Sequence, residues 1–82
     1  MEEEWWEYGQ EWITRIKGEA KNNSGQVCSP AIAAKLFNYN DVMIEKRYDF
    51  LWDMGVDETW EFEIVYYGEQ IKRYEVWVDE IY

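Results

Sequence analysis

The chain has 82 residues, of which 18 are acidic and 8 are basic, so its formal net charge at pH 7 is −10. A field of this sign repels nucleic acid and anionic membranes and attracts basic surfaces. Hydrophobic residues make up 48% of the chain and aromatic residues 20%. This composition excludes a disordered acidic tail and predicts one small domain over residues 1–82, with a core rich in aromatic side chains.

The chain contains no histidine and only one cysteine. The commonest proton shuttle near neutral pH is therefore missing, an intrachain disulfide is excluded, and a reducing compartment is favoured. The sequence opens with no basic-then-apolar leader, and it has no apolar run of the length, about 18 residues, that spans a membrane. We expect a soluble cytoplasmic protein without membrane contacts, located in the host cytoplasm if the chain is viral.

Residues 1–21 carry apolar side chains at helical spacing, which predicts a first helix. The apolar positions are Trp5, Tyr8, Trp12, Ile16 and Ala20, with Trp6 and Ile13 beside them. The resulting stripe is broader than a single packing neighbour requires. Two interpretations stay open: the helix is buried on two sides, or Trp5 and Trp6 form part of a dimer or partner surface.

The middle of the chain carries signals for two further helices. Residues 22–26 read as a loop, and the segment "VCS" after it is long enough for one short edge strand. Ser29 and Pro30 suit the cap and first position of a second helix, which ends before the "NYN" turn at residues 38–40. Asp41 suits the cap of a third helix, and Gly55 suits the residue just beyond its end.

From residue 56 onward the apolar period changes to two, which predicts a C-terminal β-hairpin. A three-residue loop at 68–70 matches the apolar faces of the two strands. The expected cross-strand pairs are Trp60 with Val78, Phe62 with Val76, and Ile64 with Tyr74.

The order of helix, short strand, helix, turn, helix and hairpin resembles a winged helix-turn-helix domain. The segments that carry this resemblance are "SPAIAAKLF", "NYND" and "YDFLWDMGV". It implies an α+β fold with three helices, a short strand and a C-terminal hairpin. In DNA-binding members of this family, the third helix enters the major groove and the wing contacts the backbone. The resemblance therefore implies nucleic-acid contacts from Lys35, Lys46, Arg47, Lys72 and Arg73.

The predicted reading helix carries Glu45, Asp49 and Asp53 on the side that would face DNA. Because affinity for DNA depends on neutralising phosphates, these carboxylates favour a basic protein surface as the partner, such as one that itself binds nucleic acid. Partner contacts are then expected from Glu45, Asp49, Asp53, Trp5 and Trp6. In size and charge the chain resembles small acidic phage inhibitors such as anti-CRISPR proteins, without a shared motif. The alternatives are a dimeric DNA-binding regulator and a domain that only assembles through its first helix.

No pattern of catalytic or metal-binding residues is present. Zinc and calcium sites need clustered ligands, and nucleotide sites need glycine-rich loops, neither of which occurs. Cys28 has no histidine partner and is predicted to be a small buried residue. The acidic pairs at residues 57–58 and 79–80 are expected to be solvated. We therefore expect neither an enzyme nor a bound cofactor.

Overall fold

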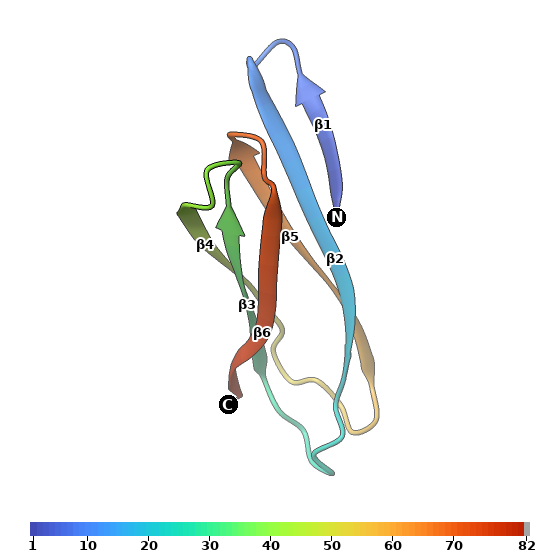
Figure 1. The fold of residues 1–82 in the computed structure, drawn as a ribbon. Coiled ribbons are helices and arrows are strands. Elements are labelled where there is room, and N and C mark those ends of the chain that lie inside the picture. The colour runs from blue at the N-terminus through green and yellow to red at the C-terminus, as the bar shows by residue number, and fades with distance from the viewer. Residues whose placement is uncertain (82) are drawn as a thin grey trace.

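The computed structural model describes residues 1–81, and of Glu80 the backbone alone. These residues form six strands and no helix. The strands are β1 (Glu2–Trp6), β2 (Glu11–Lys21), β3 (Pro30–Phe37), β4 (Met43–Phe50), β5 (Thr59–Gly68) and β6 (Arg73–Ile81). They make two antiparallel sheets of three strands, in the orders β1-β2-β5 and β4-β3-β6 (Figure 1). The predicted winged helix-turn-helix and its α+β class are therefore wrong, since the described chain is all-β.

The first predicted helix is a hairpin of β1 and β2. A spacing of four residues satisfies a helical period, but it also satisfies strict alternation along a strand. Trp12, Ile16 and Ala20 therefore lie on one face of β2, where Ile16 is fully buried. Lys17 and Glu19 lie on the other face of β2, as the two-residue period of a strand requires. The helix expected to carry a dimer contact is absent from the described chain, and a homodimer stays a prediction.

The second predicted helix is β3, the central strand of its sheet. Its residues from Ala31 to Ala34 are all buried, so both faces of the strand are covered. A short, continuous apolar run looks the same in a buried helix and in a buried strand. Ser29 does not cap a helix. Its hydroxyl oxygen instead accepts a hydrogen bond of 3.0 Å from the backbone N–H of Asp53.

The third predicted helix is β4 with the loop that follows it. Asp41, expected as a helix cap, lies in the turn before β4 with a φ of 58°. The loop at 51–58 then leads to β5, and Met54 within it forms an isolated bridge with Cys28. Cys28 is buried, as predicted.

The two predicted C-terminal strands are present, but they do not pair with each other. β5 pairs with β2, which sets Ile64 opposite Ile16, and β6 pairs with β3, which sets Val76 opposite Ala34. The turn between β5 and β6 crosses from one sheet to the other (Figure 1). Its residue Ile71 is fully buried in the core and so anchors the turn. The expected hairpin register is wrong because both apolar faces were assigned to one sheet, whereas each belongs to a different sheet of the same core.

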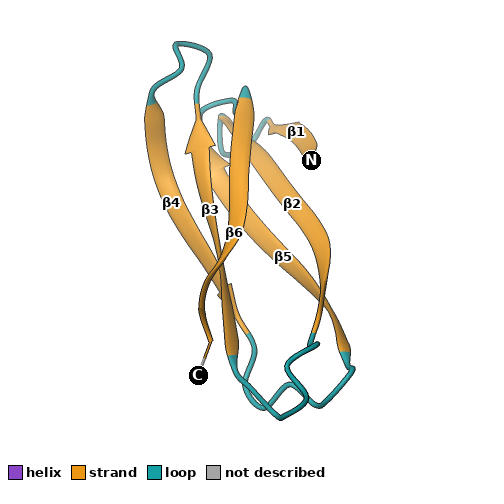
Figure 2. Ribbon diagram, turned by 60° about the horizontal axis from the view of Figure 1, so that its bottom comes forward, coloured by secondary structure: helices purple, strands orange, loops and turns teal. Residues whose placement is uncertain are grey.

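The core lies between the two sheets. Its buried members are Ile16, Ile32, Ala34, Leu36, Phe62, Ile64 and Ile71. Along one side, β4 lies beside β5, and the Asp49 carboxylate accepts a hydrogen bond of 3.0 Å from the backbone N–H of Glu63. On the other side of its sheet, β6 forms the edge (Figure 2).

One buried amide, that of Asn22, joins the two loops at one end of the sandwich. Its Nδ2 atom donates to the carbonyl oxygens of Gln26, Met54 and Gly55 at 2.8, 3.1 and 3.0 Å. Its Oδ1 atom accepts from the backbone N–H of Ser24 at 3.0 Å. Asn22 and its hydrogen bond to the Met54 carbonyl group are buried, so water has little access to replace the amide there.

Replacing Asn22 by alanine should therefore lower the free energy of unfolding by about 2–3 kcal/mol, through carbonyl groups left unpaired. The neighbouring Asn23 is exposed, so Asn23→Ala should change stability by less than about 0.5 kcal/mol. Urea unfolding followed by fluorescence measures both values. Equal stabilities of the two variants would contradict this role of Asn22.

Candidate functional site

The outer face of the β1-β2-β5 sheet carries a group of carboxylates. Glu61 and Glu63 are exposed on β5 while the residues next to them, Phe62 and Ile64, belong to the core. The register sets Glu19 of β2 directly opposite Glu61. We call Glu19, Glu61 and Glu63 the acidic face.

The acidic face has no ion pair within the described chain, although Arg15 on β2 interacts electrostatically with Glu63. Lys17 lies opposite Glu63 in the register, but its Nζ atom lies 3.9 Å from Glu2 on β1. No lysine or arginine among residues 1–81 lies within 4 Å of a carboxylate of the acidic face. Like charges directly opposite on paired strands destabilise a sheet. The repulsion between Glu19 and Glu61 is therefore a cost that no ion pair within the described residues offsets.

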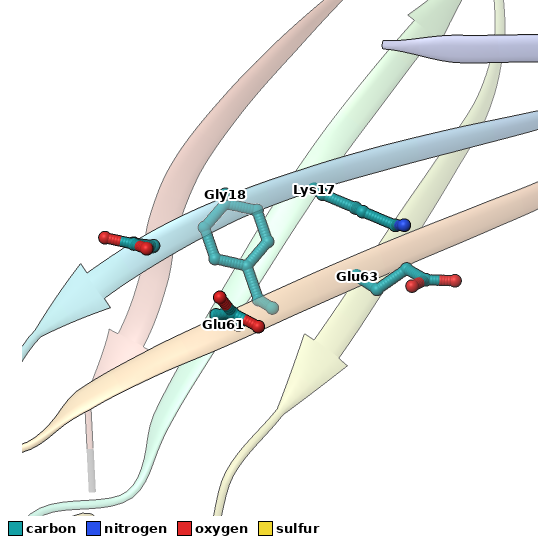
Figure 3. Close-up of a pocket in the computed structure, with 6 residues that line it drawn as sticks. Lys17, Gly18, Glu61 and Glu63 are labelled. Atoms are coloured by element: carbon teal, nitrogen blue, oxygen red, sulfur yellow. The ribbon is translucent and has the colours of Figure 1, made fainter.

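A shallow hollow of about 470 Å³ lies at the acidic face. It is lined by Lys17, Gly18, Glu19, Glu61, Phe62 and Glu63 (Figure 3). The Phe62 ring lies against Gly18, where a Cβ atom would come within 2.4 Å of the ring. Glycine is therefore needed at position 18 for the ring to pack there. Chemically, a hollow bordered by three carboxylates suits a lysine or arginine side chain.

The acidic residues predicted to share a helix face do not form one surface. Glu45 and Asp49 both lie on β4, but four residues of strand place them about 13 Å apart. Asp49 also accepts hydrogen bonds from the backbone of Phe50 and Glu63, so its charge is used within the fold. Asp53 lies in the following loop with a φ of 53°. The helical arrangement of these residues is wrong, and their contact with a partner stays a prediction.

Trp5 and Trp6 lie on opposite faces of β1 because successive strand residues alternate. The Trp5 ring packs edge-to-face on Trp12 at 5.7 Å, and the Trp6 ring on Tyr67 at 6.4 Å. Both indoles are about half exposed, at 50% and 42%. Their predicted role in partner binding stays a prediction, and one flat surface cannot include both.

Two of the predicted nucleic-acid contacts meet on the outer face of the β4-β3-β6 sheet. Lys35 and Lys46 are cross-strand neighbours, and their ammonium groups lie 5.6 and 5.4 Å from the centre of the Trp77 ring. Lys46 also lies 5.3 Å from the Tyr48 ring. We call Lys35, Lys46, Tyr48 and Trp77 the lysine–tryptophan face. Arg47 is not part of it, since its guanidinium lies over Tyr66 at 5.8 Å.

The other two predicted contacts, Lys72 and Arg73, surround Asp41. The Lys72 ammonium lies 3.3 Å from the Asp41 carboxylate, and the Arg73 guanidinium lies 3.5 Å from it. The Arg73 guanidinium also stacks on the Phe37 ring at 3.7 Å. Hydrogen bonding and charge from Lys72, supported by Arg73, lower the pKa of Asp41 below its ordinary value. Both bases are therefore already paired within the fold.

The helical reading of the sequence missed the acidic face. The signal for part of it was present in "EFEI" at residues 61–64, where alternation places Glu61 and Glu63 opposite the apolar face. The contribution of Glu19 follows only when β2 is known to be a strand paired with β5.

The described residues also bear on two simpler expectations. Among residues 1–81, no three side chains of histidine, cysteine, aspartate or glutamate are grouped so as to hold a metal ion. The same part of the chain has no helix that is long and apolar enough to cross a membrane.

Removing the Lys72 charge should raise the pKa of Asp41 toward its ordinary value, because the strongest contact that stabilises the carboxylate is lost. NMR titration of the carboxyl carbon in Lys72→Met measures this change, with Lys46→Met as a control that leaves Asp41 untouched. A lowered folded-state pKa stabilises the fold above the ordinary value of 3.8, and this contribution disappears as the pH falls through the folded-state pKa. An Asp41 titration that is identical in the wild type and Lys72→Met would refute the pairing.

Comparison of the chain with protein-family models, with curated proteins and with solved structures gave no match.

Proposed function

We propose that the protein is a non-enzymatic binding module whose acidic face binds a basic surface of a partner protein. The observation that carries this proposal is the acidic face itself. Glu19 and Glu61 are placed opposite each other with no lysine or arginine of the described chain within 4 Å of their carboxylates, beside a hollow that suits a cationic side chain.

The distribution of charge around the sandwich supports this proposal. The bases Arg15, Lys72 and Arg73 are each within 4 Å of a carboxylate. The acidic face, by contrast, adds uncompensated charge to a chain whose net charge is −10. A lysine- or arginine-rich partner would relieve the repulsion between Glu19 and Glu61, and it would be attracted over a distance. Basic surfaces that bind nucleic acid belong to this class, and blocking one would make the module an inhibitor.

Reversing charge on the acidic face tests the proposal directly. Glu61→Lys with Glu63→Lys changes the net charge from −10 to −6, since each replacement adds 2. A flexible lysine–glycine peptide of about twelve residues serves as the basic probe, because such a chain does not form strands readily. We expect the double variant to bind it about tenfold more weakly at low salt, as measured by calorimetry.

The matched control is Glu7→Lys with Glu69→Lys, which has the same net charge and alters two exposed residues outside the acidic face. It should weaken binding by only about twofold, through the overall field. If both double variants lose the same affinity, the binding depends on net charge alone and the acidic face is not the site.

The lysine–tryptophan face supports a second candidate function, the binding of single-stranded nucleic acid. Basic residues beside aromatic rings are the usual elements of such sites. However, the Trp77 ring is already contacted by Lys35 and Lys46, and Glu75 lies opposite Lys35 in the register. Bases would have to displace these lysines in order to stack. We therefore favour the protein partner.

A titration with labelled single-stranded and duplex DNA at about 50 mM salt separates the two candidates. We expect no binding, because the field of the whole chain repels phosphate. Binding that disappears in Lys35→Gln with Lys46→Gln, and survives in Lys17→Gln with Lys21→Gln, would establish the nucleic-acid function instead.

A further inference from the structure

The strand β6 forms an edge of its sheet and pairs only with β3 among the described strands. It is nine residues long and contains no proline. The free side of such a strand presents backbone N–H and C=O groups that another chain can pair with. By contrast, β5 at the edge of the other sheet lies beside β4. The backbone N–H of Glu63 on β5 donates a hydrogen bond to the Asp49 side chain of β4.

The inner face of β6 is not fully covered by the core. Val78 lies opposite the buried Ile32, yet 52% of Val78 is exposed, and Ile81 opposite Pro30 is 61% exposed. Beside them lies a groove of about 260 Å³. Its polar part comes from Lys21 and the loop at 22–24. Its apolar lining comes from Ala20, Cys28, Pro30, Ile32, Val78 and Ile81. The groove thus lies beside the edge strand β6, and its lining includes residues of β2 and β3 from both sheets.

The net charge of the chain, −10, favours a basic occupant at this edge, although Lys35 lies opposite Glu75 on the same outer face. On the outer face of β6, Glu75 and Asp79 are exposed. The Asp79 carboxylate accepts a hydrogen bond from the Trp77 indole, and the Glu75 carboxylate lies 3.9 Å from Arg73. A second copy of the chain would bring another net charge of −10 to this edge. A segment with lysine or arginine on one face would instead place these bases beside Glu75 and Asp79.

We propose that β6 receives an extended segment of a partner protein as a fourth strand of the β4-β3-β6 sheet, and that this segment alternates basic and apolar residues. Backbone groups of the segment pair with the free edge of β6, as in other cases of strand addition. Its apolar side chains enter the groove beside Val78 and Ile81, and its basic side chains lie beside Glu75 and Asp79. The preference for basic residues rests on the proposed function, whereas the strand addition does not.

A synthetic peptide of about nine residues that alternates valine and lysine is the probe, since this length matches a typical strand. We expect it to bind and to slow amide hydrogen exchange in residues 73–81, as followed by NMR. A valine–glutamate peptide and a valine–lysine peptide with the same composition but without alternation should bind at least about tenfold more weakly. A version N-methylated on alternate residues should also lose binding, and this comparison needs no change to the protein.

The matched pair of protein variants is Val78→Lys and Val42→Lys, because the two valines are 52% and 53% exposed. Val42 lies in the turn before β4, away from the groove. Val78→Lys places a charge at the groove and should weaken peptide binding about tenfold, whereas Val42→Lys should leave it within about twofold. Thermal unfolding of both variants confirms that they fold.

Three results would overturn the proposal. The first is peptide binding that slows exchange in β1 or β5 and leaves β6 unchanged. The second is equal binding of the N-methylated and unmodified peptides. The third is slowed exchange in β6 without peptide as the protein concentration rises, which would assign the edge to a second copy. The variant Glu61→Lys with Glu63→Lys separates this proposal from the previous one, since it should retain the peptide at β6 even if the acidic face binds nothing.

Discussion

Side-chain packing between the two sheets is the interaction on which the whole structure depends. The sheets share no paired strand, so the contacts of Ile16, Phe62 and Ile64 with Ile32 and Leu36 hold them together. Asp49 adds a hydrogen bond from the edge of one sheet to the edge of the other. Burial of apolar surface does not depend on direction, so it does not fix which residues face each other. The registers of β2 with β5 and of β3 with β6 determine which side chains face the core. The outer faces are then free to carry opposite chemistry.

The sequence correctly indicated the apolar residues and the turns at 22–26 and 38–40, but the period of residues 1–21 was assigned to a helix and the turn at 7–10 was missed. Four-residue spacings in β2 and the unbroken apolar run of β3 fit a helix as well as a strand. The alternation in β5 and β6 was unambiguous, and those strands are present. Their partners were not predictable from local pattern, because pairing with β2 and β3 depends on residues about 45 positions away.

The acidic character of the candidate site could be predicted from the sequence, whereas its position could not. Net charge pointed to a basic partner before any geometry was known. The carboxylates that gather on one surface, Glu19 and Glu61, come from strands that only the tertiary fold brings together. Asp49 was expected to contact a partner, but its carboxylate accepts a hydrogen bond from Glu63 on the neighbouring sheet. Charge composition is a property of the sequence alone, whereas the separation of free from internally paired charges is a property of the fold.

The crossing of the chain from one sheet to the other between β5 and β6 has a consequence for folding. Neither sheet can be completed before its last strand, β5 or β6, is available, so the central strand β3 lacks β6 until the final quarter of the chain has been made. During synthesis the apolar run at residues 31–34 is therefore exposed on an incomplete sheet, which is the condition that favours wrong association. Contacts between distant residues also slow folding, and we expect it to take milliseconds to seconds. The negative charge then has a second use, because mutual repulsion keeps unfinished chains apart.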